Sequence, residues 1–153
     1  MSADVASAAA QVLAEQVARV MLERDALSAW LGLEVLDVAP QHCTCRMTVR
    51  PEMVNGFGVA HGGIAYSFAD SAFALACNTQ GRVTVSIENS ITYPAAIHPG
   101  DVLTAVATEE ASSNKLGYYH VDVTNHHGVT VALFRGTAYR TSRLHFPDES
   151  THG

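Results

Sequence analysis

The stretch that most constrains the fold is residues 62–80, GGIAYSFADSAFALACNTQ, in which Asp70 is the one charged residue. Its alanines and the absence of proline favour a helix from about His61 to Gln80 that ends at Gly81. Apolar residues fall on every side of this helix, and a helix without a polar face is normally buried all round. The rest of the chain must therefore wrap around it.

The segments on either side of this helix read as strands, because apolar residues alternate with polar ones and turn residues separate them. A curved antiparallel sheet around the central helix is the simplest architecture that buries it. We expect the strands after the helix to form an antiparallel meander. The predicted strands are 33–39 and 43–49 before the helix, and 82–93, 100–111, 115–125 and 129–142 after it.

The N-terminal residues, from about 4 to 31, are rich in helix formers and predict a further helix with a break near Asp25 and an end at Gly32. The 153 residues, 48% hydrophobic and 16% charged, suit one globular domain over 1–143. The polar tail over 144–153 is expected to be disordered. The predicted fold class is α+β.

Charge and cysteine content narrow the possible partners. The net charge is −6 with 9 Lys and Arg, which argues against nucleic-acid binding. The 3 cysteines are read as reduced thiols, with no second pair to complete a zinc site, so no metal is expected. No signal-like N-terminus and no apolar run long enough for a membrane span is present, so we expect a cytoplasmic protein without membrane contact.

His61-Gly62-Gly63 lies where a loop becomes the central helix. The first N–H groups of a helix have no intrahelical partners and carry partial positive charge. They can stabilise a carbonyl oxygen that gains negative charge. The predicted donor is the Gly62 N–H, with that of Gly63 as second choice. The alternative is that these glycines only make a turn.

Asp70 can act as a general base or as a nucleophile if it is desolvated beside this apolar helix. The alternative is an ordinary exposed aspartate. Eight residues separate it from Gly62, about 12 Å along a helix axis. One substrate carbonyl cannot touch both residues within one chain. A two-fold dimer with antiparallel helices would bring the Asp70 of one chain to the Gly62 of the other, so we expect an obligate homodimer.

Three motifs carry a family resemblance: NGFGVAHGG, Asp70 nine residues after His61, and VALFRG at 131–136. Over roughly 23–143 the chain resembles the hotdog-fold acyl-CoA thioesterases of the phenylacetic acid degradation (PaaI) type. The resemblance implies hydrolysis of aryl- or arylacetyl-CoA, such as phenylacetyl-CoA or its ring-hydroxylated forms. It implies homodimers with shared sites that pair into tetramers. It also implies no cofactor, because CoA is part of the substrate.

The resemblance also assigns further site residues. Asn55 would hold a water or orient the carboxylate, and His61 would contact the thioester region or the Asn55 loop. Both could instead be loop residues with structural roles. Residues that fall where the family contacts substrate and its CoA arm are Gly63, Ser86, Tyr93, Lys115 and Leu116. Arg135 and Arg140 are further candidates because a local cation could hold the CoA phosphates. A plain surface role is the alternative for these residues.

Two other functions occur on this fold. Acyl-thioester hydratases and dehydratases place the acid before the histidine in a short motif, whereas here His61 precedes Asp70. Non-catalytic acyl-CoA-binding hotdog domains usually accompany a DNA-binding domain, for which this chain has neither the length nor the basic charge. Cys77 is not expected to act as a nucleophile, because the spacing implies no histidine partner, and a free cysteine in an apolar helix usually serves as a small buried residue.

Overall fold

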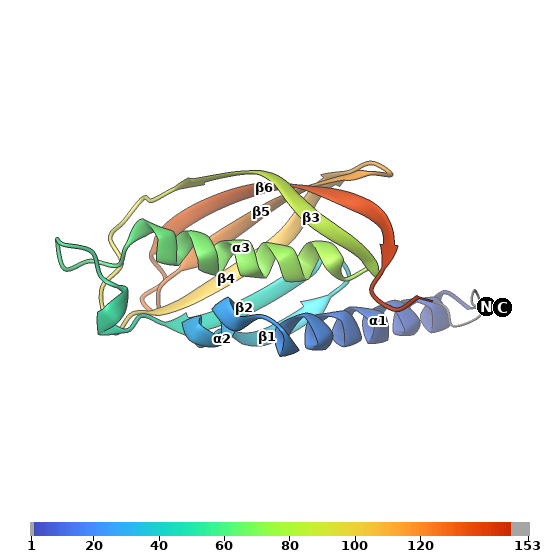
Figure 1. Ribbon diagram of the computed structural model, residues 1–153, viewed down its shortest axis with the longest axis horizontal. Helices are drawn as coiled ribbons and strands as arrows, with labels where there is room; N and C mark the ends of the chain where they lie inside the picture. The colour runs from blue at the N-terminus through green and yellow to red at the C-terminus, as the bar shows by residue number, and fades with distance from the viewer. Residues whose placement is uncertain (1, 148–153) are drawn as a thin grey trace.

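The computed structural model describes residues 2–147. Its centre is α3 (Gly62–Asn78), around which a six-stranded antiparallel sheet curves (Figure 1). Two helices precede the sheet, α1 (Ala3–Glu23) and α2 (Ala26–Leu31). The strands are β1 (Glu34–Ala39), β2 (His42–Thr48), β3 (Arg82–Thr92), β4 (Val102–Ser112), β5 (Leu116–Thr124) and β6 (Thr130–Leu144).

The break expected near Asp25 separates α1 from α2. Asp25 caps α2, because its carboxylate accepts a hydrogen bond of 2.9 Å from the Ser28 N–H. Gly32, in the left-handed conformation, ends α2. At the other end of the chain β6 runs on to Leu144, and the backbone N–H of His145 donates to Gly81 O. The ordered chain therefore extends beyond the predicted start of the tail at 144, and residues 148–153 of that tail lie outside the described part.

The strand order β1-β2-β4-β5-β6-β3 corrects the predicted meander. β4, β5 and β6 are consecutive neighbours, but β3 pairs with β6 instead of β4. Residues 93–101 link β3 to β4 past two intervening strands, a distance of about 14 Å. Nine residues can span about 30 Å, so the link is long enough to cross. As a result β3 becomes an edge of the sheet (Figure 1).

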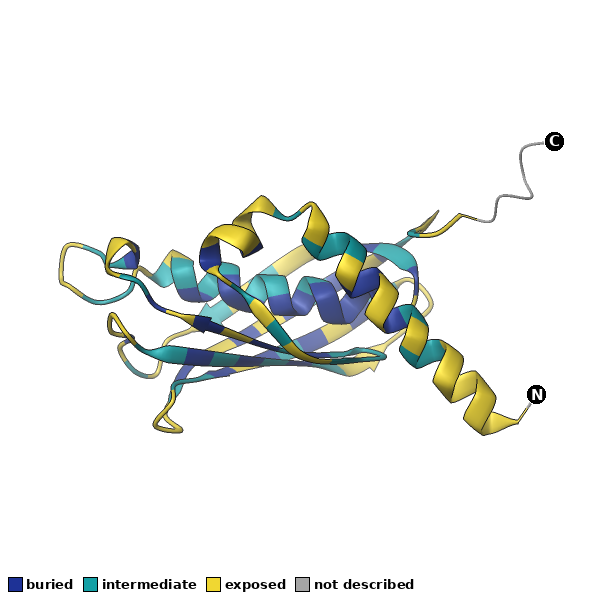
Figure 2. Ribbon diagram, turned by 90° about the horizontal axis from the view of Figure 1, so that it is seen from below, coloured by how far each residue is buried: buried dark blue, intermediate teal, exposed yellow. Residues whose placement is uncertain are grey.

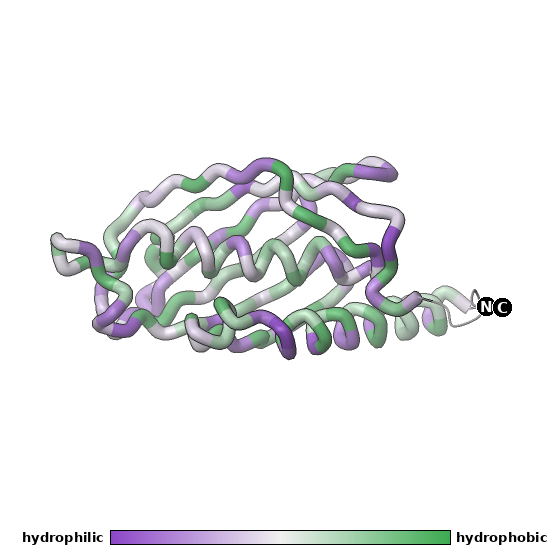
Figure 3. Tube along the Cα trace, viewed as in Figure 1, coloured by the Kyte–Doolittle hydropathy of each residue, from purple (hydrophilic) through white to green (hydrophobic). Residues whose placement is uncertain are grey.

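The core lies between α3 and the inner face of the sheet. Phe68 and Phe73 of α3 have no exposed area, and Phe73 contacts Tyr119 and Phe134 edge-on or tilted, with ring centroids 5.5 and 5.8 Å apart. Along the strands hydrophobic residues alternate with hydrophilic ones, as expected for a sheet with one covered face (Figure 3). These aromatic side chains fix how α3 lies on the sheet.

One strip of α3 is not fully covered, contrary to the prediction of burial all round. Ser67, Asp70, Ser71 and Ala74 are half-buried, and the Ser71 hydroxyl touches Ser28 of α2 at 3.1 Å. This strip contains the only charged residue of the helix. Figure 2, in which buried segments are dark blue, shows α3 buried along much of its length.

Candidate active site

The N-terminus of α3 is capped by His61. Its Nδ1 accepts a hydrogen bond of 2.9 Å from the Gly63 N–H, so the Gly63 donor is already occupied. The Ile64 N–H donates to His61 O. Within the described chain no acceptor engages the Gly62 N–H. Of the two donors considered from the sequence, only that of Gly62 is open to a ligand.

Gly62 borders a pocket beyond the end of β3. Tyr93 donates its hydroxyl to Gly62 O at 2.8 Å. Burial raises the pKa of this phenol, which favours its neutral, hydrogen-donating form. The pocket has a volume of about 370 Å³ and small apolar walls around this tyrosine. Its lining residues are Val59, Ala60, His61, Gly62, Ala65, Tyr93, Pro94, Ala95, Ala96 and Ile97.

Asp70 lies in the half-covered strip of α3 and faces β3. Its Oδ1 accepts a hydrogen bond of 3.2 Å from Asn89 Nδ2. Burial raises the pKa of the Asp70 carboxyl, and the hydrogen bond from Asn89 opposes that shift. A half-buried carboxylate with one donor keeps oxygen lone pairs for a water or a substrate atom. The arrangement suits a general base or a nucleophile.

Asp70 and Gly62 both face β3 but at different levels. Asp70 meets β3 at Asn89, whereas Gly62 meets Tyr93, just after the strand. Both belong to α3, so about 12 Å of helix separates them. The structure therefore does not bring the two groups to one point within a single chain. Because β3 is a sheet edge, both groups lie beside a surface where a second chain could pair.

Asn55 lies in the turn that leads to His61. Its Oδ1 accepts from the Phe57 N–H at 2.9 Å, and backbone bonds to Gly58 and Val59 close the loop. This is the turn role that the sequence left open as an alternative. Its Nδ2 group has no hydrogen-bond partner among residues 2–147. The amide can therefore hold the turn with its oxygen and still donate from its nitrogen.

Ser86 lies near the middle of β3, and Leu116 is the first residue of β5. Both lie beside the same part of β6, because Ser86 pairs with Ala138 and Leu116 with Tyr139. Lys115 precedes Leu116 and is exposed. The Ser86 hydroxyl donates to Asn89 Oδ1 at 2.8 Å, which links it to Asp70 through Asn89. Lys115 and Leu116 make no such link.

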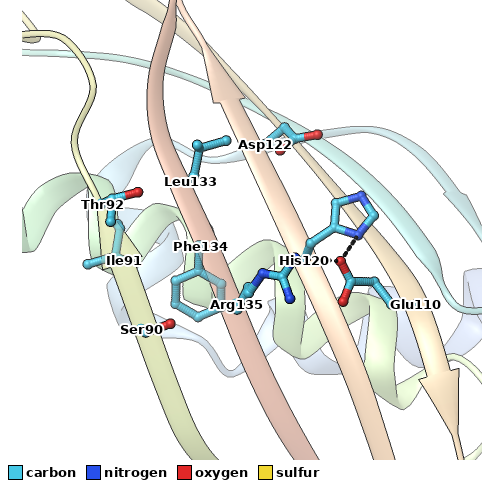
Figure 4. A pocket seen from close by; sticks show the side chains of 9 residues that line it. All are labelled: Ser90, Ile91, Thr92, Glu110, His120, Asp122, Leu133, Phe134 and Arg135. Carbon is cyan, nitrogen blue, oxygen red and sulfur yellow. Dashed lines mark ion pairs between the residues drawn. The ribbon is translucent and has the colours of Figure 1, made fainter.

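Arg135 faces away from α3, on the outer face of the sheet. Its guanidinium lies 3.3 Å from Glu110 Oε1, and His120 Nδ1 lies 3.1 Å from the same oxygen (Figure 4). The sheet therefore separates Arg135 from Asp70 of its own chain. Arg140 is 8% exposed, and its guanidinium binds Glu109 at 3.0 Å and the carbonyl oxygens of Ser113 and Leu116. These contacts make Arg140 a structural residue.

Asn89 was missed from the sequence, and Tyr66 was considered only as a possible wall of an apolar pocket. Asn89 Nδ2 donates to the Tyr66 hydroxyl oxygen at 3.0 Å as well as to Asp70. The available signal was the alternation along β3, which places Asn89 on the same face as the partly buried Ile91. A polar residue among inward-facing positions needs a partner, and Asp70 is the one charged residue of the central helix.

The described residues do not support a metal site or a cysteine nucleophile. Residues 2–147 hold no group of three or more His, Cys, Asp or Glu side chains that could bind a metal ion. The three cysteines are free and buried, and burial raises the pKa of the Cys77 thiol to about 12, which disfavours a thiolate nucleophile. None of the described helices is both long and apolar enough to cross a membrane.

Comparison with known proteins agrees with this geometry. The family model of the thioesterase superfamily matches residues 57–134. The acyl-coenzyme A thioesterase PaaI of Escherichia coli K12 is 38% identical over 125 residues, which cover 82% of this chain and 89% of that protein. The resemblance inferred from the sequence motifs is confirmed.

Solved structures give the same result. The E. coli PaaI protein from the phenylacetic acid degradation operon superposes with a TM-score of 0.86 at 36% identity, covering 88% of this chain and 97% of that one. A hypothetical thioesterase protein of Streptococcus pneumoniae TIGR4, solved with coenzyme A, superposes with a TM-score of 0.69 at 27% identity, covering 71% of this chain and 88% of that one. The chain belongs to the thioesterase superfamily and has its hotdog fold.

Proposed function

We propose that this protein hydrolyses acyl-CoA thioesters, with aryl- and arylacetyl-CoA as its substrate class, to a free acid and CoA. Phenylacetyl-CoA and its ring-hydroxylated forms are the substrates to test first. The observation that carries the proposal is a half-buried carboxylate, Asp70, on the same helix as an open N–H donor, that of Gly62. Kinship with the E. coli acyl-coenzyme A thioesterase supports the reaction class.

The reaction begins when the Gly62 N–H donates to the thioester oxygen. Asp70 takes a proton from a water molecule, whose oxygen attacks the thioester carbon, and negative charge develops on the carbonyl oxygen. When the C–S bond breaks, the CoA thiolate takes the proton back from Asp70. In the alternative route Asp70 itself attacks and expels the thiolate, and water then hydrolyses the anhydride. Both routes use the same two groups.

The composite site requires a homodimer. Two features support pairing through β3: the strand is a sheet edge, and its Val85 and Ile87 are 46% and 57% exposed. Antiparallel pairing of two β3 strands would extend the sheet and set the two α3 helices side by side. Asp70 of each chain would then face Gly62 of the partner subunit across the two-fold axis.

In such a dimer, Asn55 and His61 of one chain would lie near Ser86, Lys115 and Leu116 of the other. The pocket beside Gly62 has the small apolar walls that an acyl group or aromatic ring needs. Lys115, exposed just before the start of β5, would meet the CoA arm in this arrangement. Arg135, on the outer face, could meet CoA phosphates only where that face borders another subunit.

Pairing of dimers into a tetramer is the further assembly that we propose. The outer face of the sheet exposes Tyr118, Leu133 and Tyr139, by 42%, 43% and 37%. Tyr118 and Tyr139 lie close together on the neighbouring strands β5 and β6, and exposed aromatic side chains such as these favour burial against a second copy. A CoA substrate and buried reduced thiols fit a cytoplasmic location.

The decisive measurement is thiol release from a panel of acyl-CoAs by the wild type and by Asp70→Asn. We expect kcat to fall by about 10²-fold or more with KM little changed, because the lost group acts in the transition state. Asp37→Asn, an exposed aspartate on β1, is the matched control and should keep full activity. An Asp70→Asn variant as fast as wild type would refute the mechanism, and binding without any thiol release by the wild type would indicate a non-catalytic acyl-CoA sensor.

A further inference from the structure

Asn89 of the edge strand β3 connects three polar side chains beside α3. Its Nδ2 donates to Asp70 Oδ1 at 3.2 Å and to the Tyr66 hydroxyl oxygen at 3.0 Å, and its Oδ1 accepts from Ser86 at 2.8 Å. An ionised carboxylate can only accept hydrogen bonds, so the amide must turn its NH₂ group toward Asp70. The three contacts together fix one orientation of the Asn89 side chain.

The opposite strand leaves room for this orientation. Asn89 pairs with Gly136 of β6. A Cβ atom at Gly136 would lie 3.0 Å from Asn89 Oδ1 and 2.7 Å from Phe73 Cζ, closer than side-chain atoms pack. Any larger residue at Gly136 would displace Phe73 or Asn89. The absence of a side chain at this position therefore permits both the aromatic core and the inward amide.

We propose that Asn89 is a positioning residue for Asp70, holding the carboxylate in the one orientation that faces the substrate. This inference rests on the proposed catalytic role of Asp70. An alternative role, in which Asn89 only satisfies Tyr66 in the core, would leave the reactivity of Asp70 unchanged. The two roles differ in their effect on the ionisation of Asp70.

The pH dependence gives the sign of the effect. Burial raises the pKa of Asp70, and the hydrogen bond from Asn89 lowers it. Removal of this donor should therefore raise the pKa of Asp70. Asp70 acts when ionised, so activity increases as pH rises through its pKa. Removal of the Asn89 donor must therefore move the acidic limb of the kcat profile to higher pH.

The test compares kcat against pH for wild type, Asn89→Leu and Asn89→Asp. Leucine has the same branching and number of side-chain heavy atoms, although it is bulkier, and it removes the donor, so we expect the midpoint of the acidic limb to rise by about one pH unit. Aspartate keeps the shape but places a second carboxylate beside Asp70, so its midpoint should rise further. Ser90→Ala, the next residue of β3 on the outer face, is the control and should keep the wild-type midpoint.

The outcomes separate the two proposals. Suppose that Asp70→Asn is inactive but Asn89→Leu keeps the wild-type midpoint. The positioning role is then wrong, whether Asn89→Leu lowers kcat equally at every pH or lowers only the Tm. If Asp70→Asn remains active, the catalytic role of Asp70 fails and this inference fails with it. If Asn89→Leu does not fold, the nearly isosteric Asn89→Asp decides, and an unshifted midpoint there overturns the proposal.

Discussion

At the residue scale, Gly62 combines two requirements that only glycine meets fully. Its N–H is the open donor of the first helical turn, because His61 occupies that of Gly63. A Cβ atom at Gly62 would lie 3.1 Å from Tyr93 Oη and 3.2 Å from its Cζ, tighter than ordinary packing. A side chain at this position would push Tyr93 away and alter the pocket. The lack of a side chain and the free N–H therefore serve the same site.

Gly62→Pro tests the donor directly. Proline is tolerated at the first position of a helix, and His61 already has the extended ψ of 136° that a residue before proline needs. The helix should persist while the N–H is lost. We expect kcat to fall by about 10²–10³-fold, as for loss of an oxyanion donor, with little change in KM.

Gly62→Ala is the control for this substitution, since it crowds Tyr93 but retains the N–H. Its kcat should lie much nearer to wild type than that of the proline variant. Equal losses of kcat in the two variants would mean that crowding at Tyr93, and not the missing donor, limits the rate. Circular dichroism would show whether α3 is intact in both.

The sequence marked candidate site residues but could not show which groups their side chains contact. The motif around His61 and Asp70 marked both residues because it consists of adjacent positions in the chain. It could not show that His61 Nδ1 occupies the Gly63 donor, since that depends on the rotamer of the cap. Asn89 was missed because nineteen positions separate it from Asp70, and only the folded sheet brings the two together.

At the element scale, local patterns predicted which segments form strands but not how all the strands pair. Period-two alternation placed each strand within a few residues of its observed bounds. The neighbours of β3 depend instead on which strands the 93–101 link crosses, and on which edge of the sheet remains free for β3 beside α3. Those are properties of the assembled sheet, so the predicted meander was wrong at β3 while correct for β4, β5 and β6.

The N-terminal half of α1 contributes little to the fold. The buried residues of α1 are Ala14, Val17 and Ala18, whereas residues 2–9 are exposed and extend away from the sheet (Figure 2). An exposed alanine-rich helical segment without tertiary contacts is marginally stable in water. Removal of this segment should therefore change the free energy of unfolding of the domain only slightly.

We predict that a chain lacking residues 2–9 melts within about 2 °C of the full chain, since few buried contacts are lost. Val17→Asp should lower the free energy of unfolding by about 3 kcal/mol or more, a Tm drop of about 6–12 °C, because it buries an unpaired charge. Calorimetry measures both. A large loss of stability on truncation, with dissociation seen by light scattering, would instead show that this segment packs on another subunit.

At the scale of the whole molecule, the sheet order decides where the site can form. Because β3 is an edge, Asp70 and Gly62 lie beside a boundary of the chain instead of inside it. The half-covered strip of α3 has the same cause, since no strand beyond β3 covers it. A second chain paired there would cover the strip, extend the sheet and complete two equivalent sites at once.

Mixing two inactive variants tests this composite site. If Asp70→Asn and Gly62→Pro chains are produced together with different affinity tags, a mixed dimer contains one site with both groups intact and one site with neither. Random pairing of equal amounts makes half of the dimers mixed, so we expect about a quarter of wild-type activity from two inactive parents. Purification through both tags should raise this to about half.

The matched control pairs Asp70→Asn with a chain that carries both substitutions. No combination of those chains contains an intact Asp70, so the mixture should stay inactive although its dimers are equally crowded at Gly62. Recovery in the first mixture and none in the second requires that Asp70 of one chain act with Gly62 of its partner, because no single chain in either mixture holds both groups. Doubly tagged dimers without activity in the first mixture would place both groups of each working site in one chain, and the pairing through β3 would then have no catalytic role.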